Sequence, residues 1–213
     1  MSAFLRVNRE GRRAAEAKIR ELTGGESSPK PLWTGAFRQQ PNSKVFANFP
    51  EERTYEAGGR TIDVEWHLGI DLASQKRVPI EASNAGRVVF TGANGIYGNM
   101  VLLDHGLGLF TLYGHLSETD VKPGQDVKQG EAIGRSGETG LAGGDHLHFG
   151  LLVRGVYASP LEWWDPHWLR DRIAKPLADA GVALPGITNG ALTAGGVSAP
   201  APARRAAARP RSR

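Results

Sequence analysis

Apolar residues in the middle of the chain occur in short runs that either alternate with polar positions or remain continuously apolar. Glycine, proline or asparagine, which favour turns, separate most of these runs. No apolar pattern of helical length interrupts them. We therefore expect a mainly β, compact antiparallel sheet or sandwich rather than alternating strands and helices. The predicted strands are 53–57, 60–64, 86–91, 99–104, 109–114, 131–135 and 146–153, and Gly58-Gly59 predicts a two-residue hairpin between the first two.

Helical patterns are confined to the two ends of this region. Residues 9–22 favour a short helix that stops at Gly24-Gly25, and its thin apolar stripe predicts only light packing against the rest of the protein. Residues 161–174 predict a second short helix, with Asp165 as its N-cap and Pro166 in its first turn.

These patterns divide the chain into three parts. Residues 1–44 form the N-terminal helix and a linker arm rich in serine, proline and asparagine, and residues 45–174 form the β domain. Residues 175–213 are dominated by alanine, proline, glycine and arginine, a composition typical of a disordered tail.

The formal net charge of +4 and the pI near 9.6 raise the question of nucleic-acid binding. The segment from residue 176 onward holds five arginines and one aspartate, so it accounts for the whole net charge. The folded part is neutral and has no basic excess for a polyanion, so we expect no nucleic-acid partner. The chain has no cysteine, which excludes disulfides and thiolate metal sites.

Two histidine patterns are candidates for metal chemistry. His67 and Asp71 are four residues apart, which corresponds to roughly 13 Å between Cα atoms in a straight strand. Both can reach one ion only if the chain curls between them, and Gly69 permits such a curl. His146 and His148 are two apart, so on a strand both rings point to one face, where one can bind a metal while the other addresses what the metal binds.

A mixed set of histidine and aspartate suits zinc. Three protein ligands leave a fourth position for water, which is typical of a catalytic rather than a structural site. Zinc lowers the pKa of such a water and polarises a carbonyl group. The helical His-Glu-x-x-His motif is absent from the sequence, so a zinc peptidase site here must be built on strands.

Longer motifs around these histidines resemble the lysostaphin/LytM-type zinc metallopeptidases, a family of bacterial peptidoglycan endopeptidases. The matching residues are His67-Leu68-Gly69-Ile70-Asp71-Leu72-Ala73, Tyr113-Gly114-His115-Leu116-Ser117 and Gly144-Asp145-His146-Leu147-His148-Phe149-Gly150. Connecting motifs such as 121–127 and 130–134 occur between them in the family's order, and the resemblance covers about residues 64–165.

The resemblance implies a LytM-like fold with a duplicated hybrid motif and one Zn²⁺ per chain. It makes His67, Asp71 and His148 the zinc ligands. His115 and His146 then take the general-base and transition-state-stabilising roles, in an order that the sequence leaves open. The implied substrate is the peptide stem of peptidoglycan, with cross-links between D-alanine and meso-diaminopimelate ahead of glycine bridges.

Other expectations concern the cleft and the location. We expect Asn99 and Tyr113 to contribute to substrate binding, and the glycine-rich loops 92–98 and 137–145 to form the walls of a peptide groove. The family implies a monomer in the bacterial cell envelope, yet the sequence has no export signal or membrane-spanning run. We therefore expect a longer protein whose upstream segment tethers it to the membrane.

An inactive relative is the main alternative. Some members of this family have lost their zinc ligands and act only as wall-binding or amidase-activating modules. Because this sequence retains every residue of the three motifs, the resemblance favours an active enzyme.

Overall fold

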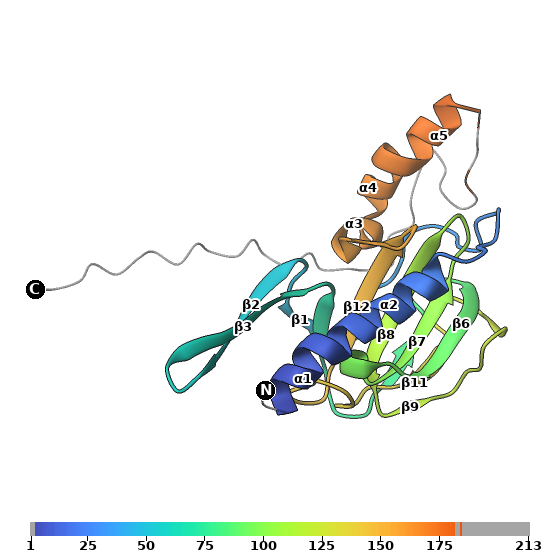
Figure 1. Cartoon of the computed structure of the whole chain (residues 1–213). Helices are drawn as coiled ribbons and strands as arrows, with labels where there is room; N and C mark the ends of the chain where they lie inside the picture. The colour runs from blue at the N-terminus through green and yellow to red at the C-terminus, as the bar shows by residue number, and fades with distance from the viewer. Residues whose placement is uncertain (1–2, 182–183, 185–213) are drawn as a thin grey trace, which may run out of the picture.

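The computed structural model describes residues 3–181 and 184, and it consists mostly of antiparallel β-structure (Figure 1). The strands are β1 (Lys44–Ala47), β2 (Glu51–Ala57), β3 (Arg60–His67), β4 (Ile70–Ala73), β5 (Pro79–Glu81), β6 (Gly86–Ala93), β7 (Asn99–Asp104), β8 (Leu109–Leu116), β9 (Glu118–Thr119), β10 (Asp126–Val127), β11 (Ala132–Arg135), β12 (Leu147–Val153) and β13 (Val156–Ala158).

The main sheet has the strand order β1–β4–β12–β8–β7–β6–β10, and β13 pairs with β12. A small sheet has the order β5–β11–β9, and β2 pairs with β3 in a separate hairpin. Every strand pair within the described residues is antiparallel. The predicted antiparallel β domain with short flanking helices is confirmed.

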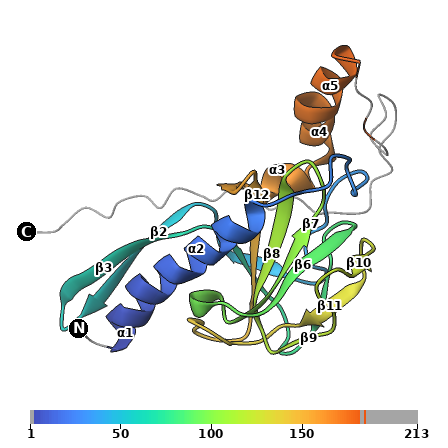
Figure 2. The same cartoon turned by 45° about the vertical axis from the view of Figure 1, so that its right-hand side comes forward.

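Both faces of the main sheet are covered, which explains why the central strand β8 is buried at every position. The C-terminal helices, the small sheet and the segment containing Trp33 and Phe37 pack on one face, against Val101, Leu103 and other residues of the larger core. The N-terminal helix covers the other face, where α2 lies across the strands in Figures 1 and 2.

The N-terminal helical segment comprises α1 (Ala3–Arg6), a π-helical stretch η1 (Val7–Gly11) and α2 (Arg12–Thr23). The prediction that it packs only lightly is wrong. Ala15 and Ile19 are fully buried against the sheet, and the buried amide of Asn8 donates to Asp63 Oδ2 at 2.9 Å. The apolar stripe of this helix is narrow because the helix lies close to the sheet, and a close approach needs small residues at the contact rather than many large ones.

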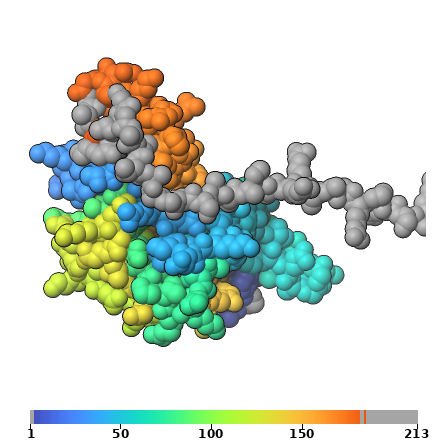
Figure 3. Space-filling model, turned by 180° about the vertical axis from the view of Figure 1, so that it is seen from behind, coloured from blue at the N-terminus to red at the C-terminus, as the bar shows by residue number. Residues whose placement is uncertain are grey.

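The β2–β3 hairpin projects from the body of the protein, as Figures 1 and 3 show. Its turn is Gly58-Gly59, with φ of 58° and 72°, as expected for a tight two-residue loop. The predicted hairpin is confirmed, and β3 extends beyond the predicted end to His67.

The C-terminal segment is broken where one helix was predicted. It forms α3 (Pro160–Trp164), α4 (Pro166–Leu169), a π-helical stretch η3 (Arg170–Ala174) and α5 (Lys175–Asp179). Asp165 caps α4, accepting from the backbone N–H of His167 at 2.8 Å. The first residues of the predicted tail are therefore helical, and most of that tail lies outside the described residues. Within the described part, no helix is long and apolar enough to cross a membrane.

Candidate metal centre

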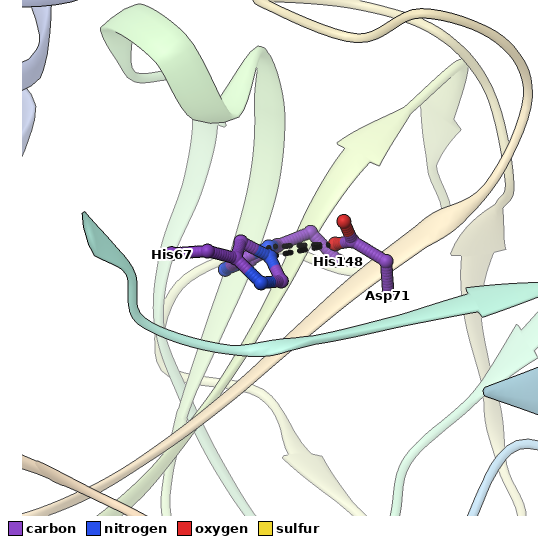
Figure 4. Close-up of side chains that lie close together, drawn as sticks. All are labelled: His67, Asp71 and His148. Carbon is purple, nitrogen blue, oxygen red and sulfur yellow. Dashed lines mark hydrogen bonds and ion pairs between the residues drawn. The ribbon is translucent and has the colours of Figure 1, made fainter. Parts of the chain in front are cut away.

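Strand pairing brings three predicted site residues together. Asp71 on β4 lies directly opposite His148 on β12, and His67 ends β3 just before the turn that leads into β4. The side chains converge, with His67 Nε2 2.9 Å and His148 Nδ1 3.0 Å from Asp71 Oδ1, and the two ring nitrogens 3.0 Å apart (Figure 4). All three residues are buried.

Hydrogen bonds alone do not account for this cluster. His67 Nδ1 lies 3.2 Å from the carbonyl oxygen of Asn48, so it carries the proton of the neutral ring and leaves a lone pair on Nε2. That lone pair faces a carboxylate oxygen and a second ring nitrogen at about 3 Å, an arrangement that a cation between them would stabilise. The donor set of two imidazoles and a carboxylate fits zinc, so the cluster can hold a metal ion.

Gly69 makes room for the ring of His148. A Cβ atom at Gly69 would lie 2.5 Å from His148 Cε1 and Nε2, and 2.8 Å from the carbonyl oxygen of Phe149. The backbone of Gly69 does not have a positive φ. Glycine is therefore required here by the close approach of the neighbouring strand.

Two further imidazoles lie beside the cluster, and both have fixed orientations. His115 Nδ1 donates to the carbonyl of Thr139 at 2.8 Å, and His146 Nδ1 donates to the carbonyl of Gly144 at 2.7 Å. The ring centroids are 4.7 Å apart, and His146 Nε2 is 3.6 Å from Asp71 Oδ1. In the neutral rings both Nε2 atoms are therefore free to accept a proton.

His115 also has a left-handed backbone, with φ of 62°. Such a conformation costs a non-glycine residue about 1–2 kcal/mol and is maintained only by the surrounding structure. In this case β8 and the hydrogen bond to Thr139 hold it. Strain of this kind is common at functional sites.

The electrostatic environment shifts the pKa values of these groups in different directions. Burial alone would raise the pKa of Asp71, but the adjacent side chains of His146, His148 and His67 lower it far below its usual value. Burial lowers the pKa of His115 to about 3, with the neighbouring His148 and His146 acting in the same direction, and it lowers the pKa of His148 to about 4. Burial opposes protonation of His146 as well, yet hydrogen bonds to Asp71 and Gly144 raise its pKa.

The cluster lies at the floor of an open groove of about 570 Å³. Its lining includes parts of both predicted glycine-rich loops, namely Ile96, Tyr97, Leu141, Gly143, Gly144 and Asp145. Phe46 on β1 is the extra residue of a β-bulge, and its largely exposed ring packs edge-on against His146 with centroids 5.4 Å apart. A bulge re-aims a side chain in this way next to a site.

The two residues predicted to bind substrate do not line this groove. Tyr113 is buried in the core, where its hydroxyl accepts from the backbone N–H of Ser83 at 2.7 Å. Asn99 opens β7, and its backbone N–H donates to Thr139 Oγ1 at 2.9 Å.

The groove residues that sequence reasoning missed include Arg12, Phe46 and Arg53. They lie on the N-terminal helix, a strand bulge and the hairpin. No sequence motif identifies these residues. Arg53 lies on β2, which pairs with the strand that ends at His67, and this pairing could have indicated that Arg53 is close to the site.

Comparison with known proteins agrees with this fold and identifies the family. The model of peptidase family M23 matches residues 65–160. The peptidoglycan DD-endopeptidase ShyA of Vibrio cholerae is 41% identical over 123 residues, which cover 56% of this chain and 28% of ShyA. The DD-carboxypeptidase/endopeptidase Mpg of Neisseria gonorrhoeae is 41% identical over 95 residues, which cover 45% of this chain and 22% of Mpg. This chain thus spans about a quarter of the length of these relatives.

Among solved structures, the catalytic domain of the antimicrobial peptidase lysostaphin from Staphylococcus simulans is 30% identical with a TM-score of 0.51. The match covers 58% of this chain and 92% of that domain. The antiparallel β domain of this chain is therefore of the lysostaphin-like class of peptidase domains. The chain belongs to peptidase family M23, and the predicted resemblance is confirmed.

Proposed function

We propose that this protein is a zinc-dependent endopeptidase that hydrolyses the peptide cross-links of bacterial peptidoglycan. The observation that carries the proposal is the buried His67–Asp71–His148 cluster at the floor of an open groove, next to two imidazoles that present free Nε2 atoms. The similarity to proteins named as peptidoglycan DD-endopeptidases supports the substrate class.

The ligand atoms in this proposal are His67 Nε2, Asp71 Oδ1 and His148 Nδ1. The hydrogen bond to Asn48 keeps the proton of His67 on Nδ1, and the low pKa of Asp71 keeps its carboxylate ionised. When bound, zinc would supply a water of lowered pKa and a Lewis acid for the scissile carbonyl.

His115 and His146 would share the proton transfers. One accepts a proton from the attacking water at Nε2 and passes it to the leaving nitrogen as the peptide bond breaks. The other, protonated at Nε2, donates a hydrogen bond to the oxygen that becomes negative in the transition state. Their Nδ1 hydrogen bonds to backbone carbonyls fix both rings in advance, so little reorganisation is needed.

The groove suits an extended peptide. Gly143 and Gly144 have room for a substrate backbone to approach closely, since nothing lies within 4 Å of a Cβ at either residue. Because similar proteins are named DD-endopeptidases, the proposed target is the cross-link between D-alanine and meso-diaminopimelate rather than a glycine bridge. In this proposal the protein acts in the cell envelope, as a monomer with one zinc ion.

Zinc content and digestion of purified sacculi test the proposal together. The zinc-loaded protein should release soluble peptides, and chelation should stop the release. His148→Ala should lose metal and activity together, whereas His115→Ala should retain most of the metal and lose activity. His167→Ala is the matched control, because this histidine lies on α4 with 71% of its side chain exposed.

The same experiment separates the enzyme from an inactive wall-binding or amidase-activating module. Such a module would bind sacculi without releasing peptides and would retain no stoichiometric zinc. Equal digestion by the parent, His148→Ala and His115→Ala would contradict the assignment of the site.

A further inference from the structure

The two carboxylate oxygens of Asp71 have different partners. Oδ1 faces His67 and His148, whereas Oδ2 accepts a hydrogen bond from Arg53 Nη2 at 2.7 Å. The Asp71 side chain is 3% exposed and that of Arg53 is 33% exposed, so this ion pair extends from the cluster to the groove surface. Arg53 therefore occupies the side of the carboxylate that the two histidines leave open.

A β-bulge places Arg53 at this position. From the Gly58-Gly59 turn the hairpin register runs regularly to Glu56 opposite Thr61, then shifts by one residue, so that Arg53 lies opposite Glu65. Without that shift, Arg53 would lie opposite Val64, whose side chain is on the exposed face of the hairpin. The shift turns the guanidinium towards the face that ends at His67.

Contacts outside the main sheet keep the hairpin in place. Arg9 Nε of the N-terminal helix donates to Asp63 Oδ1 at 3.0 Å, and Asn8 donates to the other oxygen of the same carboxylate. Glu51 Oε1 accepts from Arg53 Nε at 3.2 Å, which orients the guanidinium. Arg53 also precedes the residues that the family model matches, so the Arg53–Asp71 ion pair joins a residue outside that span to one inside it.

The contact limits what Asp71 can offer to a cation. A guanidinium is always charged, and its hydrogen bond to a carboxylate is strong and directional. With Oδ2 held in this way, only Oδ1 points into the cluster. If the guanidinium were removed, the carboxylate could rotate and present both oxygens, and its full negative charge would act on the ion.

We propose that Arg53 is a positioning residue that restricts Asp71 to a single metal-facing oxygen and so keeps a position at the ion open for water and substrate. The inference rests on the proposed metal site. The physical consequence is that Arg53 lowers the affinity of the site for the metal and raises the catalytic turnover.

Cobalt substitution tests this directly, because the visible absorption of protein-bound Co²⁺ depends on the number of ligand atoms. Arg53→Ala should still bind Co²⁺, with an affinity equal to that of the parent or up to about 10-fold higher. Its visible band should be weaker, which would report an added carboxylate oxygen. The kcat of the zinc form should fall by about 10- to 100-fold, with a smaller change in KM. Arg53→Lys retains the charge and should restore part of the parent spectrum.

Arg87→Ala is the matched control, since Arg87 pairs with Asp126 on the exposed surface and should alter neither spectrum nor kcat. An unchanged cobalt spectrum in Arg53→Ala would overturn the inference, and so would weaker metal binding that accompanies the loss of activity. A parent protein that binds no Co²⁺ or Zn²⁺ would overturn the proposed function and this inference together. A parent that binds metal and digests sacculi while Arg53→Ala behaves identically would overturn the inference alone.

Discussion

Replacing Gly69 with alanine should damage the metal centre by a defined steric route. The new methyl group would lie 2.5 Å from the ring of His148 and 2.8 Å from the carbonyl oxygen of Phe149. That carbonyl belongs to β12, which pairs with β4 on one side and β8 on the other, so its backbone has little freedom to retreat. The ring of His148 must then move, and its Nδ1 leaves the cluster.

The magnitude follows from the overlap. Overpacking of this kind costs about 1–3 kcal/mol in free energy of unfolding, and displacing a ligand should weaken zinc binding by at least about 10-fold. Urea unfolding of the metal-free protein and competitive zinc titration measure the two effects separately. Gly143→Ala is the matched control in the same groove, because nothing lies within 4 Å of its Cβ position and its stability should change by less than about 0.5 kcal/mol. If Gly69→Ala matched this control in both assays, the steric reasoning would be refuted.

Three further predictions concern the groove, the helix and pH. Phe46→Ala should raise KM for a cross-linked peptide more than it lowers kcat in steady-state kinetics, because the exposed ring forms the groove wall beside His146. A larger fall in kcat than rise in KM would contradict this and would show that the ring mainly orients His146. Asn8→Ala should cost about 1–3 kcal/mol in urea unfolding, since it leaves the buried Asp63 oxygen without its amide partner, and a change below 0.5 kcal/mol would contradict this. The metal-free protein should lose stability as pH falls from about 6.5 towards 3, because the depressed pKa of His115 means that the unfolded chain binds protons at a higher pH than the folded protein. His115→Gln should reduce the dependence of the free energy of unfolding on pH. An equal pH dependence in the variant and the parent would contradict this prediction.

Local sequence signals predicted the parts of this structure that depend on neighbouring residues. Gly58-Gly59 specifies the hairpin turn through its positive φ angles. The spacing of His146 and His148 predicts that both rings point the same way, and both pack against the ring of His115, although His146 lies in an isolated bridge just before β12. The pairing of Asp71 with His148 depends on residues 77 positions apart, and only the family motifs indicated it.

Features that depend on register and packing were not accessible to the same reasoning. A single-residue shift in the hairpin decides whether Arg53 faces the metal site or the solvent, and no residue type in the strand marks it. Likewise, Tyr113 resembles a cleft residue in sequence, but β8 is central and buried on both faces, so its hydroxyl serves the core.

The N-terminal helix illustrates a related limit. Its apolar stripe is short, yet Gly95 lets the helix come close enough that a Cβ there would lie 2.7 Å from the carbonyl oxygen of Gly11. Tyr97 in the same loop donates to Glu16 at 2.5 Å and packs its ring against His148 with centroids 5.1 Å apart. The helix is thus connected to the metal centre through contacts that no periodicity predicts.

Chromatography of the peptides released from defined sacculi tests the central claim most directly. The zinc-loaded protein should convert dimers cross-linked between D-alanine and meso-diaminopimelate into monomers, and the chelated protein should not. Dimers that persist unchanged in the presence of zinc-loaded, folded protein would contradict the account.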